Sequence, residues 1–150
     1  MEPKWITTLS ALLTPTIAII AVLVAIRQSK INQNKLRLEL FDRRIEIFQK
    51  IGAYLSEILQ TGYATNSELT QFLRDTQYAY FVFGKDIQEY VEEIYKKSND
   101  LYTVVVMFDK LKDSKAQEKN EDKRKELFTY FEKEIVSFRK RFEKYLKLQG

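Results

Sequence analysis

A run of 22 residues without a charged side chain, from Trp5 to Ile26, constrains this chain more than any other feature. At a helical rise of 1.5 Å per residue, the run extends about 33 Å, and the hydrocarbon core of a bilayer is roughly 30 Å thick. A secretory signal peptide is the alternative, but its apolar region usually has roughly 7–15 residues before a small-x-small cleavage site. This run ends in VAIRQSK, which offers no such site. We therefore expect a single uncleaved transmembrane helix at residues 5–26.

Basic residues gather on the C-terminal side of this run, whereas only Glu2 and Lys4 are charged before it. The basic residues that follow are Arg27, Lys30, Lys35, Arg37, Arg43 and Arg44. The positive-inside rule places this side in the cytoplasm. We expect residues 1–4 outside, 5–26 in a bacterial inner membrane, 27–35 as a basic juxtamembrane segment and 36–150 in the cytoplasm. The same cations suit anionic lipid headgroups or an acidic partner, although charges that only set topology on a solvated helix face explain them too.

Small side chains recur along the predicted span at spacings of four and three residues. They are Thr7, Ala11, Thr14, Ala18, Ala21 and Ala25. Such a face lets two helix backbones approach closely, which favours self-association within a membrane. Chance is the competing explanation, because Ala and Thr are common in membrane spans. Pro15 is expected to kink the helix, either as a passive bend or as part of a gating helix.

The composition excludes several kinds of chemistry. The chain has no Cys and no His, which removes disulfides, thiol catalysis, Cys/His zinc sites and the commonest general base. No phosphate-binding loop, dinucleotide glycine motif, nucleophile elbow or calcium loop is present. We therefore predict no catalytic residues, no metal site and no cofactor, and we do not expect an enzyme.

Hydrophobic periodicity after residue 35 predicts an all-α fold, with an antiparallel cytosolic bundle of about four helices. The first helix has heptad, coiled-coil-like spacing from Leu38 to Leu59 and ends at Gly62. Thr65 and Glu68 form a capping box for a second helix at about 66–83, although its aromatic end could alternatively form a short strand. Asp86 and Glu89 are expected to form a similar capping pair that opens a third helix at about 86–113. The charged stretch 114–123 is predicted to be mostly loop, and the last helix covers about 121–148.

Two aromatic clusters admit both a functional and a packing interpretation. Tyr78, Tyr80, Phe81 and Phe83 precede Gly84 and either line a pocket for a ligand or partner or pack in the core. The segment 137–147 interleaves Phe138, Phe142 and Tyr145 with basic residues, a mixture also found in nucleic-acid-binding proteins. Helical spacing puts its aromatics on the core stripe and most cations away from it. We therefore expect a solvated or membrane-facing surface and no nucleic-acid partner.

The stretches KLRLELFDRRIEIF (35–48) and FVFGKDIQEYVEEIY (81–95) carry a family resemblance. Together with the preceding apolar run, they resemble small uncharacterised bacterial membrane proteins that have one N-terminal transmembrane helix and a helical cytosolic domain. The resemblance implies that architecture but carries no activity. Small anchored helical proteins also serve as effectors in bacterial stress and anti-phage systems, by analogy only.

These patterns lead to one main functional hypothesis and two alternatives. The main hypothesis is a membrane-anchored, non-enzymatic interaction or assembly module, a homo-oligomer that presents its bundle at the cytoplasmic face, with room for a protein partner. The first alternative is a membrane-perturbing effector or pore component of a stress or anti-phage system, with hydroxyls such as that of Thr14 and the Pro15 kink lining a path. The second alternative is a sensor or signalling subunit, but the segment 1–4 before the span is too short to bind a ligand alone.

Overall fold

The computed structural model describes the backbone of residues 4–108, 110–111 and 113–147, and side chains from residue 16 onward within these ranges. The described residues form five α-helices and no strand. They are α1 (Lys4–Thr61), α2 (Asn66–Thr76), α3 (Ala79–Phe83), α4 (Lys85–Phe108) and α5 (Ser114–Leu146). The predicted all-α class is therefore confirmed, and the 79–83 segment is helical rather than extended.

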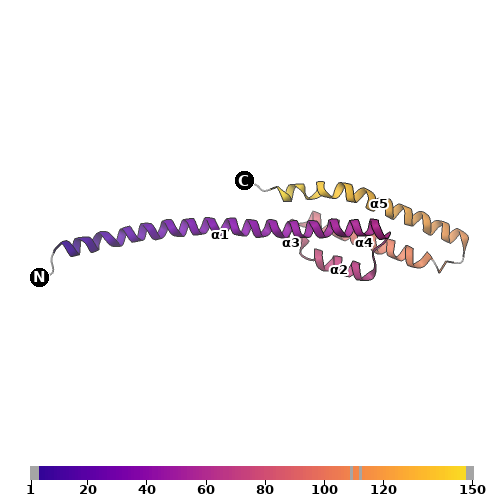
Figure 1. Ribbon diagram of the computed structural model, residues 1–150, viewed down its shortest axis with the longest axis horizontal. Coiled ribbons are helices and arrows are strands. Elements are labelled where there is room, and N and C mark those ends of the chain that lie inside the picture. The colour runs from indigo at the N-terminus through magenta and orange to yellow at the C-terminus, as the bar shows by residue number, and fades with distance from the viewer. Residues whose placement is uncertain (1–3, 109, 112, 148–150) are drawn as a thin grey trace. The chain divides into compact units, whose positions relative to one another are not determined.

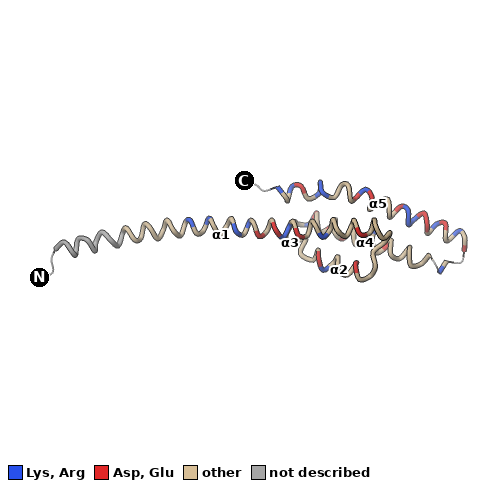
Figure 2. Tube along the Cα trace, viewed as in Figure 1, with Lys and Arg blue, Asp and Glu red and all other residues tan. Residues whose placement is uncertain are grey.

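The chain divides into two compact units, residues 1–40 and residues 41–150. In the first unit, α1 runs without a break through the juxtamembrane stretch, and every described side chain from 16 to 40 is exposed. From residue 16 the described side chains carry no charge until Arg27, where Lys and Arg begin (Figure 2). In the part of the chain that the structure describes, no helix has the combined length and apolarity needed to cross a membrane. Side chains 5–15 of the expected span lie outside the described residues.

The second unit is a helical bundle built on an antiparallel pair, α4 and α5 (Figure 1). Asn120, near the start of α5, donates to the carbonyl of Val104 near the end of α4 at 2.9 Å. At the other end of the pair, the Tyr145 hydroxyl donates to Asp86 at 2.6 Å. The part of α1 from residue 41 onward packs on this pair, and the Phe48 ring stacks on that of Phe138 with centroids 5.0 Å apart.

The core of the bundle lies where the apolar stripes of the five helices meet. Tyr54 of α1 stacks on Phe72 of α2 with ring centroids 4.1 Å apart, and Phe142 of α5 meets Phe83 of α3 edge to face at 5.1 Å. The largest fully buried apolar side chains are Phe131, Phe142, Ile51, Leu55, Ile58, Ile87, Ile94 and Leu101. The core therefore contains aromatic and aliphatic residues from all the predicted helices, which confirms the bundle.

The turn structure agrees with the sequence at three points. Thr65 and Glu68 form the predicted capping box: the Thr65 amide donates to the Glu68 carboxylate at 2.7 Å, and the reciprocal bond is 3.4 Å long. Gly62 and Gly84 end their helices with φ of 87° and 110°, backbone conformations that side chains with a Cβ rarely adopt.

The predicted helix 66–83 is instead two helices, with a corner at Gln77 and Tyr78. The Tyr78 carbonyl accepts from the amides of both Phe81 and Val82, which starts a new turn in a new direction. Buried positions nevertheless continue through the corner from Thr76 to Ala79 and Phe83. The periodicity of the sequence therefore persists across the break and could not reveal it.

The boundary between the last two helices was also predicted wrongly. Helix α4 ends at Phe108 rather than near residue 113, and the stretch 114–123 is helical rather than a loop. That stretch has few apolar residues, but it lacks Gly and Pro and is rich in Lys, Glu and Gln, which favour helices. The expected capping pair at the start of α4 is absent as well: Asp86 lies inside the first turn and binds Tyr145, and Glu89 pairs with Lys85.

Candidate interaction surface

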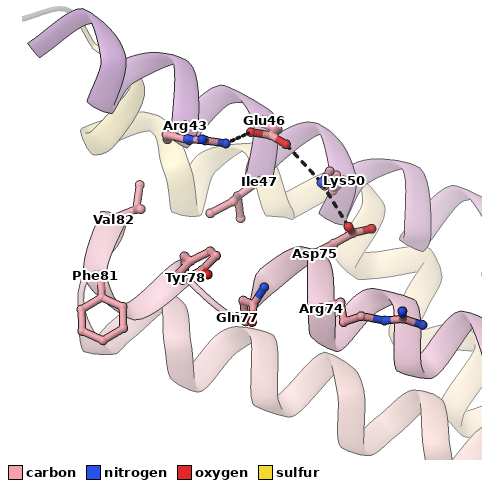
Figure 3. A pocket seen from close by; sticks show the side chains of 10 residues that line it. All are labelled: Arg43, Glu46, Ile47, Lys50, Arg74, Asp75, Gln77, Tyr78, Phe81 and Val82. Atoms are coloured by element: carbon pink, nitrogen blue, oxygen red, sulfur yellow. Dashed lines mark hydrogen bonds and ion pairs between the residues drawn. The ribbon is translucent and has the colours of Figure 1, made fainter. Parts of the chain in front are cut away.

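A groove of about 810 Å³ lies in the bundle unit between α1 and the corner that joins α2 to α3 (Figure 3). Its size is in the range of small-molecule and side-chain binding sites. We call it the corner groove. It is lined by Arg43, Glu46, Ile47, Lys50, Arg74, Asp75, Gln77, Tyr78, Phe81 and Val82. The groove therefore lies where the chain turns between α2 and α3.

One wall of the corner groove is a chain of ion pairs that links α1 to α2 (Figure 3). Arg43 binds Glu46 at 2.9 Å, Glu46 binds Lys50 at 3.1 Å, and Lys50 reaches Asp75 at 3.0 Å. Hydrogen bonds from Lys50 and then Arg43 lower the pKa of Glu46, and the bond to Asp75 raises the pKa of Lys50. These groups keep their charges over the physiological pH range, so the wall carries both signs.

The opposite side of the groove is aromatic and apolar. Tyr78 is 61% exposed and Phe81 is 79% exposed, whereas Ile47 at the base is only 5% exposed. The predicted aromatic cluster is therefore divided. Phe83 packs in the core, whereas Tyr78, Tyr80 and Phe81 remain at the surface. The packing interpretation is confirmed for Phe83, whereas Tyr78 and Phe81 line the corner groove. Binding of a ligand or partner by these aromatic residues stays a prediction.

Arg44 has a structural role beside this groove. Its Nε donates to the carbonyl of Val82 at 3.0 Å, and its Nη1 donates to the carbonyl of Tyr145 at 3.2 Å. The guanidinium also lies 5.5 Å from the centre of the Tyr145 ring. Both carbonyls belong to the last turns of helices, where acceptors lack intrahelical partners. Arg44 therefore joins three helices and differs from the other predicted membrane-face cations.

The remaining predicted site residues belong to the first unit. Arg27, Lys30, Lys35 and Arg37 are all exposed, as are Ala18, Ala21 and Ala25 of the small-residue face. Thr7, Ala11, Thr14 and Pro15 lie outside the residues whose side chains the structure describes. Both self-association through this face and the pore hypothesis therefore stay predictions.

The basic and aromatic segment 137–147 separates into two faces. Phe138 and Phe142 are buried, while cations from the same turns face outward. Lys144 binds Asp86 at 2.9 Å, and Arg141 lies over the Tyr90 ring at 4.5 Å. The aromatics thus belong to the core, as the helical spacing predicted.

A buried polar cluster between α4 and α5 was not predicted. Glu134 is only 8% exposed, and its Oε1 accepts from Arg141 at 3.4 Å. Burial, followed by the charge of Glu134, raises the pKa values of Tyr90 and Tyr130. The only feature of the sequence that relates to this cluster is the presence of Arg141 seven residues after Glu134. Such a spacing is common in a helix rich in Lys and Glu, so it does not predict a buried pair.

No metal centre is visible in the described part of the chain, where no group of three His, Cys, Asp or Glu side chains is placed to hold an ion. The other grooves described in the bundle are smaller: one between α1 and α5, lined by Phe48 and Val136, has about 490 Å³, and one between α1 and α2 has about 150 Å³. The corner groove is therefore the best candidate for a functional surface.

No protein-family model matches the chain, and neither a curated protein nor a solved structure shows significant similarity to it.

Proposed function

We propose that this protein is a membrane-anchored, non-enzymatic assembly module that holds its helical bundle at the cytoplasmic face of a bacterial inner membrane. The observation that carries the proposal is the contrast between a closed bundle core and a helix whose apolar side chains remain exposed. From Ile17 to Ile26, seven large aliphatic side chains are at least half exposed, and they point to all sides of the helix. A helix that is apolar all round needs a hydrocarbon or protein environment.

The sequence supplies the rest of the support. The uncharged run extends from Trp5 to Ile26, and the exposed cations at Arg27, Lys30 and Lys35 follow directly. Cations at this position favour the cytoplasmic side and attract anionic headgroups, at about 1 kcal/mol for each residue near the surface. The bundle would then be presented to other proteins or to further copies of the chain.

Membrane extraction and protease protection test the anchor. The expressed full chain should stay with membranes after alkaline carbonate washing, and protease added to inverted vesicles should cleave the bundle. Release of the protein by carbonate would contradict the anchor. Protection of the bundle in inverted vesicles, with cleavage only from the outer side, would contradict its orientation.

The oligomeric state tests assembly through the small-residue face. The mass of the extracted protein should be measured by multi-angle light scattering, with wild type beside the Ala18→Leu/Ala21→Leu variant. Larger side chains should prevent close approach of the helices and lower the mass of the assembly. The Leu36→Ala variant is the control, because residue 36 is exposed on α1 beyond the apolar run.

A further inference from the structure

We infer that the corner groove is a two-fold contact between two copies of this chain, with Phe81 of each copy seated in the groove of the other. This inference rests on the proposed function, because a membrane anchor confines the copies to a surface and raises their effective concentration. The contact lies entirely in the bundle unit. It is therefore separate from association through the predicted transmembrane helix.

The first argument is the combination of a projecting side chain and a groove on one surface. Phe81 stands at the rim with 79% of its surface exposed, and the base beside it is formed by Ile47 and Val82 (Figure 3). In a two-fold interface the same patch serves both partners, so each copy must offer a projection and a matching hollow. Aromatic side chains that fill such hollows usually carry much of the binding energy.

The second argument is the charge pattern around the groove. The rim carries three cations (Arg43, Lys50 and Arg74) and two carboxylates (Glu46 and Asp75). A copy of the same surface, turned by a two-fold axis, can place opposite charges against each other. A strongly acidic partner would meet the two carboxylates, and so would an anionic lipid surface. A second copy fits this mixture better than either.

The third argument concerns the contacts within the chain that already hold the side chains of the groove in place. The ion-pair chain holds the polar wall in place, and Tyr80 contacts Phe81 edge to face with ring centroids 5.4 Å apart. These contacts pre-order the groove, which lowers the entropy lost when a partner binds. Phe81 itself packs little against its own chain, so its exposed ring remains available to the partner.

The test measures energy transfer between copies of the full chain in vesicles. Because the chain has no cysteine, a single Lys140→Cys substitution allows donor and acceptor dyes to be attached at one exposed position. Dilution with lipid then gives the dissociation constant in the membrane. We expect Phe81→Asp to raise this constant at least tenfold, with Tyr78→Asp acting in the same direction.

Val136→Asp is the matched control, because Val136 is 81% exposed on α5 and lies outside the corner groove. It should leave the energy transfer unchanged. Helical content and thermal unfolding should match wild type in all variants, since the changed side chains are exposed. Equal dissociation constants for Phe81→Asp and Val136→Asp would overturn the inference.

A monomeric chain and a lipid-covered groove are the two remaining outcomes. A wild-type chain that is membrane-integral but monomeric overturns the inference and leaves the anchor intact, whereas a chain that fails to integrate contradicts the proposed function itself. A spin label at a Phe81→Cys site separates protein from lipid contact. Greater exposure of this label to oxygen dissolved in the bilayer than of a label at position 136 would show that lipid covers the groove, which also overturns the inference.

Discussion

The part of α1 before residue 41 and the part from residue 41 onward differ in the burial of their apolar side chains, although they belong to one helix. From residue 16 to 40 every described side chain is exposed, including large aliphatic residues such as Ile20 and Leu23. From residue 41 onward the apolar residues occupy one stripe, where Ile51, Leu55 and Ile58 are fully buried and charged residues face out.

This difference shows that the bundle buries the apolar side chains of the second segment and leaves those of the first segment exposed. Burial of apolar area stabilises the second segment by about 25 cal/mol for each Å², whereas the first segment gains nothing comparable from its own chain. Propensity alone stabilises long helices only weakly in water. The first segment therefore depends on surroundings that the bundle does not provide, and the second does not. The contrast predicts that changes within the bundle alter its free energy of unfolding, whereas changes in the first segment alter membrane insertion.

The largest effect is expected from Phe131→Ala in the bundle. Phe131 is completely buried on α5, so truncation removes packing and leaves a cavity. We expect the free energy of unfolding to fall by about 3–5 kcal/mol. Urea denaturation followed by circular dichroism measures this change. Val136→Ala on the same helix should change it by less than about 0.5 kcal/mol, and equal effects would contradict the buried core.

A charge in the first segment should act on membrane insertion and leave the bundle intact. Ile19→Lys puts a cation inside the apolar run and should disfavour insertion by up to about 3 kcal/mol. A glycosylation-mapping assay of insertion provides the measurement. Ile31→Lys is the control, because residue 31 lies beyond Arg27 and is equally exposed. If both variants insert as wild type does, the segment 16–26 does not act as part of an anchor.

Arg44→Met tests whether bonds to helix ends hold the bundle together. Methionine keeps much of the side-chain volume but leaves the carbonyls of Val82 and Tyr145 without these donors. We expect a loss of about 1–3 kcal/mol in the free energy of unfolding. Arg43→Met removes only a surface ion pair and should cost less than about 1 kcal/mol. Comparable losses for the two variants would remove the distinction between these neighbouring arginines.

The smallest effect concerns acid. The hydrogen bond from Tyr145, followed by that from Lys144, lowers the pKa of Asp86 below its ordinary value of 3.8. The lowered pKa means that this stabilisation is present above pH 3.8 and is lost as the pH falls through the lower value of the folded state. Because the pair is half exposed, solvent screens it and the change is small. Asp86→Asn should flatten the pH dependence of the thermal midpoint in this range, and an unchanged profile would contradict the assignment.

Much of the bundle was predictable because its determinants are local. The capping box at Thr65 and the stops at Gly62 and Gly84 depend on a few neighbouring residues, and the structure confirms all three. The apolar stripes also identified most of the core. The prediction of a loop at 114–123 is wrong, because a low content of apolar residues does not indicate irregular structure: an exposed helix needs few of them.

The corner groove could not be predicted, because no local pattern records the break at Tyr78 or the approach of Asp75 to Lys50. The role of Arg44 was equally hidden: its partners are 38 and 101 residues away, and in the sequence it resembles its neighbour Arg43. The buried Glu134 likewise depends on how α4 and α5 pack.

The all-α class, the charge distribution and several of the helix ends thus follow from the sequence alone, since periodicity, capping and composition act over one or two turns. Tertiary packing determines which aromatics stay at the surface, which arginine joins three helices and where a groove opens. Those features depend on contacts between residues that are distant in the chain. Such residues come close to each other only when the helices pack.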